Sequence, residues 1–383
     1  MFRSLLSTSK DFLFEQLLPN WSQYGIDAEK GFSYESMNHN WTKNAVGRIR
    51  LLTQCRQLYT FSHAYQFESK AEWLAKLTPL FDFITTQYFH DDRWFFSLND
   101  DLSVKDKQSD AYALAFVLLS FSYYYQVTKD KRALDYMKST HHFLLDNMQA
   151  KMGGFYEAYP IDTQQVRRQN PHMHLLEGYI AAFNTTRDED YKTVINSLLS
   201  LAVEHFYDKK TKTLREFFSE NWKYHSTTGH QVEPGHHFEW VWLLYQANKI
   251  SPDQTHIDLA QSLWSTATRH GIESDGGIYN QIDGNSYQAI DKEKRIWPIT
   301  EYLKAITVLP MGLEEKQHRI ESALSFMTKH YFLENGRWNE YLDANNEAKS
   351  FPLPGTSSYH IFLGLTEVLT WDKQTLSDSE TDI

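Results

Sequence analysis

Two histidines lie near the starts of segments whose other residues predict apolar helices. His236 and Glu239 belong to PGHHFEWVWLL, and His360 belongs to PGTSSYHIF. A buried polar group costs on the order of a few kcal/mol unless it is paired. These side chains therefore belong either to a satisfied structural network or to the wall of a cavity. Because imidazole titrates near neutral pH, two neutral histidines facing one cavity would suit removal of a proton from carbon and its return.

The sequence around His236 predicts its charge and its partner. Pro234 and Gly235 place His236 in the first turn of a helix, where the positive end of the macrodipole disfavours an imidazolium. We therefore expect His236 to be neutral near pH 7. Glu239 follows on the same helix face and can bind either this imidazole or a ligand hydroxyl. His237 points about 100° away around the helix and is predicted to be structural.

Similar side chains recur beside other predicted helix starts and apolar runs. They are Arg56, Tyr112, Asn170, His172, His174, Glu177, Trp297 and Glu301. Because they belong to different segments, a closed architecture could bring them to one end of a shared cavity. That convergence is the functional interpretation. For any single histidine, an ordinary buried position with satisfied hydrogen bonds is the commoner case.

Two other chemistries stay open for these residues. The run HMHLLE, from His172 to Glu177, combines His-x-His with a carboxylate, which is a metal-ligand set. On a helix, however, His172 and His174 would point about 200° apart, whereas His174 and Glu177 would share a face. Glu177, Glu239 and Glu301 could also supply the carboxylate pair of a glycosidase. We predict that the site uses no metal and no cofactor.

Apolar residues at helical spacing predict about twelve helices and little long strand. The predicted helices cover 2–18, 44–66, 71–88, 110–128, 131–148, 173–186, 190–205, 236–248, 254–270, 296–309, 314–330 and 358–371. Six short connectors resemble one another, at Phe32, Trp94, Phe155, Leu214, Ile278 and Trp338. Subtracting these numbers gives separations of 62, 61, 59, 64 and 60. This period indicates a repeat of helix pairs, each with a short extended hairpin.

A helix pair cannot bury its apolar face alone, so neighbouring pairs must stack. We therefore predict an all-α (α/α)6 barrel over residues 1–370, with short β-hairpin-like connectors and one central cavity. An open helical solenoid is the alternative. Residues 371–383 are polar and acidic, and they are predicted to form a frayed tail.

Composition limits the partners of this 383-residue chain. The net charge is −11 without any basic run, which argues against a nucleic-acid partner. Cys55 is the single cysteine, so no disulfide framework is expected. No apolar run reaches the roughly 18 residues of a membrane span, and no secretory signal is evident. We expect a cytoplasmic protein, with homo-oligomerisation left open. The aromatic content of 15% would provide stacking surfaces for sugar rings.

Five segments resemble consecutive motifs of the N-acylglucosamine 2-epimerase superfamily. They are CRQLYTFSHAY, NPHMHLLEG, PGHHFEWVWLL, RIWPITEYLKA and PGTSSYHIF, in the order of the family, within residues 40–365. The superfamily includes cellobiose 2-epimerases, mannose isomerases and sulfoquinovose isomerases. The Phe-Glu-Trp-x-Trp pattern after Pro-Gly-His looks more like the mannose and sulfoquinovose isomerases than the 2-epimerases.

The resemblance implies a metal-independent (α/α)6 barrel that acts on the reducing end of a sugar. His360 and His236 match the two acid/base histidines, and Arg56 matches the arginine that holds oxygens where enediol charge develops. Glu239 matches the glutamate that supports His236. Four further residues match side chains that contact sugar hydroxyls or stack on the ring: Tyr112, Asn170, His174 and Trp297. We expect Glu177 to contact the substrate as well.

The expected function is interconversion of D-mannose and D-fructose through a cis-enediol. His236 would help to open the pyranose, and His360 would move the proton between C2 and C1. A sulfoquinovose isomerase, or a 2-epimerase of the N-acylglucosamine or cellobiose type, is the alternative on the same scaffold. For epimerisation, His236 would reprotonate C2 from the opposite face. Other classes are an (α/α)6 glycosidase and a non-catalytic sugar-binding protein. A sulfonate would need extra cations, for which the neighbouring residues are Arg168, Lys294 and Arg295.

Overall fold

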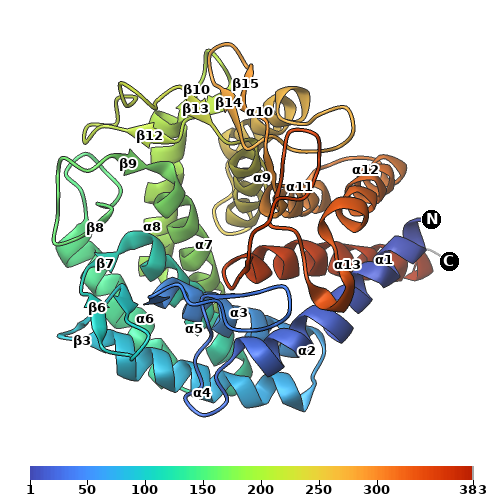
Figure 1. Ribbon diagram of the computed structural model, residues 1–383. Helices are drawn as coiled ribbons and strands as arrows, with labels where there is room; N and C mark the ends of the chain where they lie inside the picture. The colour runs from blue at the N-terminus through green and yellow to red at the C-terminus, as the bar shows by residue number, and fades with distance from the viewer. Residues whose placement is uncertain (382–383) are drawn as a thin grey trace.

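The computed structural model describes residues 1–381 as two concentric rings of helices (Figure 1). The inner ring contains α3 (Leu51–Phe67), α5 (Ala111–Thr128), α7 (Gln169–Thr186), α9 (Pro234–Asn248), α11 (Ile296–Val308) and α13 (Ser357–Thr381). The outer ring contains α4 (Ala71–Tyr88), α6 (Arg132–Phe143), α8 (Glu189–Leu201), α10 (Gln254–His270) and α12 (Leu313–Phe326). The chain begins in the outer ring with α1 (Phe2–Asp11) and α2 (Leu18–Asn20). Short π-helical turns extend the outer helices at Phe12–Leu17, Trp21–Gly25, Leu144–Met148, Ala202–Phe206 and Met327–Tyr331.

The inner ring is continuous. Going round it, α3, α5, α7, α9, α11 and α13 each pack against the next, and α13 packs against α3. Helices α1 and α13 lie side by side (Figure 1), where the rings of Phe2 and Trp371 are 6.5 Å apart and Arg3 pairs with Asp372. The predicted (α/α)6 arrangement is therefore confirmed, and the open solenoid is excluded.

The six predicted connectors occupy equivalent places, each between an outer helix and the following inner helix. In each, the chain pairs with itself a few residues after the outer helix ends. These pairs are Ile26 with Ser33, β3 (Phe89–His90) with β4 (Arg93–Trp94), Gln149 with Phe155, β10 (Tyr207–Asp208) with β11 (Thr213–Leu214), Ile272 with Ile278, and Phe332 with Trp338. The repeat read from the sequence therefore corresponds to a repeated structure.

A second set of strands links each connector to the next unit. The strand before an inner helix pairs with the following connector in five cases: β2 (Ile49–Arg50) with β5 (Ser97–Leu98), β7 (Ser109–Asp110) with β8 (Ala158–Tyr159), β9 (Arg167–Arg168) with β12 (Phe217–Phe218), β13 (Gln231–Val232) with β14 (Gln281–Asp283), and β16 (Lys294–Arg295) with β17 (Tyr341–Leu342). In the sixth, β18 (Leu353–Pro354) pairs with β1 (Ser36–Met37) and closes the ring. β6 (Val104–Asp106) and β15 (Ala289–Asp291) add a third strand to two of these pairs, and Glu334–Gly336 forms a 3-10 turn.

The predicted helix boundaries differ most from the structure at four places. The helical run predicted to end at residue 18 continues to Gly25. The helix predicted from residue 44 begins at Leu51, because Gly47 has a φ of 70° and β2 precedes the helix. The helix predicted from residue 173 begins at Gln169. The helix predicted to end at residue 371 continues to Thr381, so the predicted tail is helical as far as it is described. Residues 382–383 of that tail lie outside the described residues.

All six inner helices begin at the connector end of the rings, so their first turns surround one mouth of the central cavity (Figure 1). These helices are covered on every side. On α5, for example, buried residues run from Ala111 to Ser122 with one interruption, as expected for a helix inside a protein core. Within residues 1–381, none of the helices has both the length and the apolarity needed to cross a membrane.

Candidate active site

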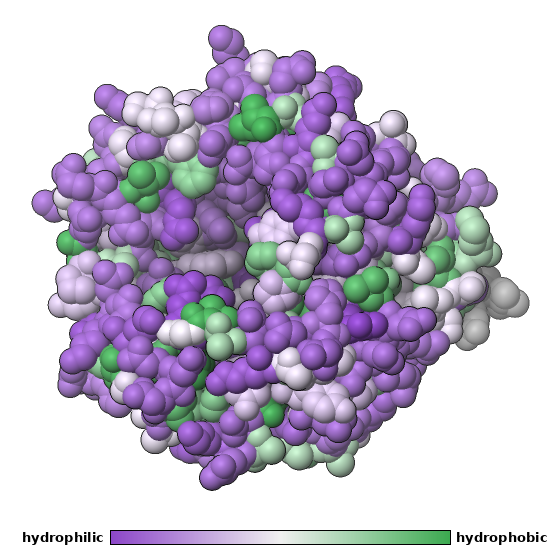
Figure 2. Space-filling model, in the orientation of Figure 1, coloured by the Kyte–Doolittle hydropathy of each residue, from purple (hydrophilic) through white to green (hydrophobic). Residues whose placement is uncertain are grey.

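A cavity of about 170 Å³ opens at the mouth of the inner ring, where the surface is hollowed near its centre (Figure 2). Every inner helix contributes to it, through its first turns or the residue before it. The lining residues are Arg56, Tyr112, Asn170, His174, Glu233, His236, Glu239, Arg295, Trp297, Thr356, Ser357 and His360. Of the nine residues predicted for the site, all but Glu177 line this cavity. A larger groove, of about 460 Å³, runs beside α6 and α8 and contains none of the nine.

His360 on α13 is held as a neutral base. Its Nδ1 lies 2.9 Å from a carboxylate oxygen of Glu301, and Glu301 forms an ion pair with Lys304 at 2.8 Å. Because a carboxylate only accepts, Nδ1 carries the proton and Nε2 keeps its lone pair. Burial, together with the charge of Arg56, holds the pKa of His360 well below its ordinary value. His360 is therefore an unprotonated imidazole near pH 7.

His236 on α9 is instead protonated. Its Nδ1 donates to Glu216 at 2.9 Å and lies 3.7 Å from a carboxylate oxygen of Glu233. Burial alone would lower the pKa of His236, but the two carboxylates raise it to about 10. The expectation of a neutral His236 is therefore wrong, because two nearby negative charges outweigh the positive end of the helix.

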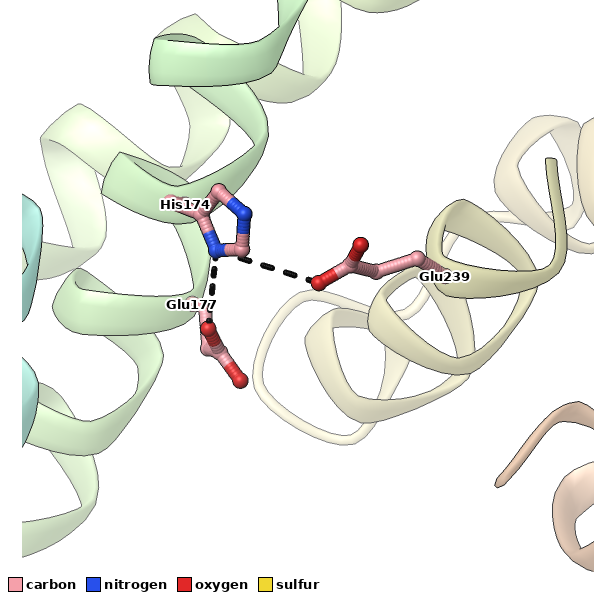
Figure 3. Close-up of side chains that lie close together, drawn as sticks. All are labelled: His174, Glu177 and Glu239. Carbon is pink, nitrogen blue, oxygen red and sulfur yellow. Dashed lines mark hydrogen bonds and ion pairs between the residues drawn. The ribbon is translucent and has the colours of Figure 1, made fainter. Parts of the chain in front are cut away.

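Glu239 forms no hydrogen bond with His236 or with any other of the described residues. One of its carboxylate oxygens lies 3.8 Å from Nδ1 of His174 (Figure 3). Burial lowers the pKa of His174 to about 4, so this histidine is neutral and the contact is not an ion pair. The supporting role expected for Glu239 belongs instead to Glu216, which also accepts from the side-chain amide of Gln169 at 2.8 Å.

Glu216 could have been found from the repeat. Glu35 and Glu157 occupy the same connector position, and each pairs with the arginine just before the next inner helix. Arg50 lies 2.8 Å from Glu35, and Arg168 lies 2.7 Å from Glu157. In the unit of Glu216, that arginine position holds Glu233, so Glu216 has no arginine partner there. The glutamate at this arginine position is the departure from the repeat that identifies Glu216 as the acceptor for His236.

A group of buried charges lies below the cavity. Glu177 accepts from the hydroxyl of Tyr359 at 2.5 Å and from Nδ1 of His174 at 3.2 Å. Glu177 is predicted to contact the substrate, but it does not line this cavity and lies beneath it as the partner of His174. Lys304 was not anticipated, since a lysine in a helical pattern usually predicts an exposed position. Here its side chain is 0% exposed, beside Glu301.

Arg56 and Trp297 shape the walls between the histidines. The guanidinium of Arg56 donates to the Tyr112 hydroxyl at 2.6 Å and to the Thr356 carbonyl at 3.1 Å, so its direction is fixed. The ring of Trp297 lies 5.0 Å from that of His236 and 5.8 Å from that of His360. Trp297 therefore contacts both histidines and offers a flat apolar surface to a ligand.

Two further histidines are structural. The Nε2 atoms of His172 and His237 accept from the backbone N–H groups of Phe155 and Leu214, at 2.9 and 3.1 Å. Burial lowers the pKa of His172 to about 3 and that of His237 to about 4. Both rings therefore stay neutral and tie a connector to an inner helix. The structural role predicted for His237 is confirmed, and His172 points away from His174 as expected.

The three cations considered for a sulfonate have different surroundings. Lys294 is buried in an ion pair with Glu273 at 2.8 Å. Arg168 pairs with Glu157. Of the three, Arg295 lines the cavity, and Glu340 is close enough to offset part of its charge.

Comparison with known proteins gives consistent matches over nearly the whole chain. Residues 31–364 match the family model described as N-acylglucosamine 2-epimerase (GlcNAc 2-epimerase). The chain is 26% identical to a protein of Rhizobium meliloti (strain 1021) named mannose-6-phosphate isomerase, over 93% of this chain and 95% of that one. It is 22% identical to a D-mannose isomerase of Marinomonas mediterranea, over 90% and 92% of the two chains. The solved structure of a cellobiose 2-epimerase from Bacillus thermoamylovorans B4167 has the same fold, with a TM-score of 0.86, 20% identity, and coverage of 95% and 98%.

Proposed function

Because the chain belongs to the N-acylglucosamine 2-epimerase family, we propose that it interconverts D-mannose and D-fructose through a cis-enediol. The family is one of sugar isomerases and epimerases. The observation that carries the finer proposal is the pair of buried histidines beside Trp297. Two carboxylates surround Nδ1 of His236 and favour its imidazolium, whereas the glutamate bound to His360 is paired with Lys304. An acid and a base held apart in this way divide the proton transfers of the reaction between them.

The charges suggest an order of events. The imidazolium of His236 donates a proton to the ring oxygen, the bond between C1 and that oxygen breaks, and the C1 hydroxyl gives its proton to water, which exposes the aldehyde; His236 then regains a proton from water. Nε2 of His360 then removes the proton from C2. The negative charge that develops on the sugar oxygens is stabilised by Arg56, whose direction is already fixed. His360 returns its proton to C1, the hydroxyl hydrogen on O2 passes to O1, and the product is the ketose.

The size and charge of the cavity support a neutral monosaccharide. Its volume of about 170 Å³ is below the roughly 300–1,000 Å³ of pockets for drug-sized ligands, so a disaccharide such as cellobiose would extend beyond it. A phosphate or sulfonate would need cations without partners. Arg295 already has Glu340 at 3.6 Å, and Arg56 is bound to Tyr112 and Thr356.

A 2-epimerase is the second candidate, and the charge of His236 favours it specifically. A protonated His236 could deliver a proton to C2 of the enediol from the face opposite His360, which would convert mannose to glucose. Relatives named cellobiose 2-epimerase share the family.

The decisive experiment is NMR of the purified protein with D-mannose in D2O containing EDTA. We expect fructose that carries deuterium at C1. Glucose with deuterium at C2 would indicate the epimerase instead. Turnover that disappears only when EDTA is present would indicate a metal-dependent isomerase.

The same assay should be repeated with mannose 6-phosphate, sulfoquinovose, N-acetylmannosamine and cellobiose. Faster turnover of a charged or larger sugar would overturn the substrate assignment. Hydrolysis of a mannoside without change in free mannose would indicate a glycosidase. Binding without turnover of any of these sugars would indicate a sugar-binding protein.

A further inference from the structure

Three buried glutamates meet around one lysine at and below the cavity floor. Glu177, Glu239, Glu301 and Lys304 are each at most 4% exposed. The carboxylate of Glu239 lies within 4.8 Å of acceptor or donor atoms of His174 and Glu177 on one side, and of Glu301 and His360 on the other. Glu239 is therefore the middle member of the three carboxyl groups.

The three carboxyl groups have unequal partners. Glu177 accepts from Tyr359 and His174. Glu301 pairs with Lys304 and accepts from His360. Neither oxygen of Glu239 accepts a hydrogen bond from any of the described residues. Figure 3 shows its carboxyl group directed towards His174, where the dashed line spans 3.8 Å, which is too long for a hydrogen bond.

The local charges decide which group carries a proton. Burial alone would raise the pKa of Glu177, but the hydrogen bond from His174 and the charge of Lys304 lower it to about 2. Burial also raises the pKa of Glu301, while Lys304 favours its ionised form. A third negative charge between them would have neither a cation of its own nor a hydrogen-bond donor. Burial and repulsion by Glu301 and Glu177 therefore raise the pKa of Glu239 well above its ordinary value.

We propose that Glu239 is a neutral carboxylic acid in the folded protein and that its O–H donates a hydrogen bond to an oxygen of the bound sugar. The hydrogen bond to the sugar rests on the proposed function, whereas the neutral state of Glu239 does not. The titratable groups that face Glu239 are Tyr112 on α5, His174 and Glu177 on α7, His236 on its own helix, Glu301 and Lys304 on α11, and Tyr359 and His360 on α13.

A neutral donor at this place has a chemical use. Glu239 lines the cavity beside His360, so its O–H can reach an oxygen on which enediolate charge develops. A donor fixed in a buried site stabilises that charge without reorganising during the reaction. The proton stays on Glu239, so no bond is formed or broken at this residue.

The first test compares Glu239→Gln with Glu301→Gln. Glutamine has nearly the shape of glutamic acid and keeps a neutral donor, so Glu239→Gln should retain isomerase activity within about tenfold of the unaltered protein. Glu301→Gln removes the anion between Lys304 and His360 and should lose about 100-fold or more. Equal losses in the two variants would overturn the proposal.

Urea unfolding at several pH values gives a readout that does not depend on activity. An unfolded glutamate ionises near pH 4.3, whereas Glu239 stays protonated in the folded protein, so the unaltered protein loses stability as pH rises from about 5 to 8. Glu239→Gln lacks this loss, and its urea midpoint relative to the unaltered protein should increase steadily over that range. A midpoint difference that is independent of pH would contradict a neutral Glu239.

Infrared spectroscopy of the protein labelled with 13C-carboxyl glutamate tests the protonation state directly, even if the variant fails to fold. A protonated carboxyl band should be present at pH 7, should be absent from Glu239→Gln, and should shift when mannose or fructose is added. Absence of the band from the unaltered protein would overturn the proposal. If the unaltered protein turned over no sugar, the proposed function would fail, while the band and the urea midpoints would still decide the state of Glu239.

Discussion

His236 and His360 have the same kind of direct partner but different protonation states. Each is less than a tenth exposed, and each presents Nδ1 to a glutamate oxygen at 2.9 Å. Yet the pKa of His236 is raised to about 10, whereas that of His360 is lowered. The hydrogen-bonded partner therefore does not determine the protonation state by itself.

The difference between the two pKa values arises from the charged groups around each glutamate. Glu216 is joined by a second carboxylate, Glu233, and among the described residues neither forms an ion pair with a lysine or an arginine. Glu301 is neutralised by Lys304, and Arg56 adds positive charge near His360. The net charge around each glutamate thus decides whether its histidine acts as an acid or as a base.

Removing either histidine should have the largest effect. In His360→Gln, removal of the C2 proton should slow by about 10²–10⁴-fold, because the base is lost. His236→Gln should slow ring opening but leave exchange of the C2 proton from open-chain sugar. NMR of deuterium incorporation at C2 and C1 measures both steps. Loss of exchange in His236→Gln alone would reverse the assignment.

Removing the anion beside His236 should have the next largest effect. Glu216→Gln lowers the pKa of His236 from about 10, so the alkaline limb of the kcat/KM profile should move to lower pH. At pH 8 we expect about a tenfold to 100-fold loss, within the range of acid–base catalysis. Glu157→Gln is the matched control, because Glu157 has the same repeat position but pairs with Arg168. The same shift of the limb in both variants would contradict a specific effect on His236.

Lys304→Met should bring the pKa of His360 closer to that of His236. Without the ammonium group the pKa of His360 rises, and the acid limb of the kcat/KM profile should move to higher pH. Breaking a fully buried ion pair also costs about 3–5 kcal/mol of folding free energy, measurable by urea unfolding. Lys304→Met combined with Glu301→Leu should recover much of that stability, since both charges are then removed. An unchanged acid limb in Lys304→Met would argue against charge compensation at His360.

The smallest expected effect is a change in the slope of stability against pH. The folded pKa of His236, about 10, exceeds the unfolded value of about 6.5. Its stabilisation is therefore fully present below pH 6.5 and is lost as pH rises towards 10, by at most about 1.4 kcal/mol per pH unit. His360 has the opposite sign and costs stability as pH falls below about 6.5. His236→Gln should flatten the alkaline decline in unfolding free energy, and an unchanged decline would contradict the raised pKa.

The sequence was informative wherever a property is local. The helix pattern and the connectors around Phe32 and Trp338 predicted the ring, because each unit repeats the same short-range pairing. Most of the cavity residues were identified because they lie in the first turns of inner helices. The charge of His236 was predicted wrongly because Glu216 is separated from it by twenty positions. A helical pattern that contains Lys304 gives no sign that this face of α11 points to the axis.

The pairing of β18 with β1 joins Ser36 to Pro354, a separation of 354 − 36 = 318 residues. The entropy of closing so long a loop grows only slowly with its length, but a contact between such distant residues forms late when folding begins from local helix pairs. Around the axis this junction resembles the other five strand pairs. A chain joined from α13 to α1 and reopened within another connector would therefore keep the same ring. The order of the six units along the chain is separable from their order around the cavity.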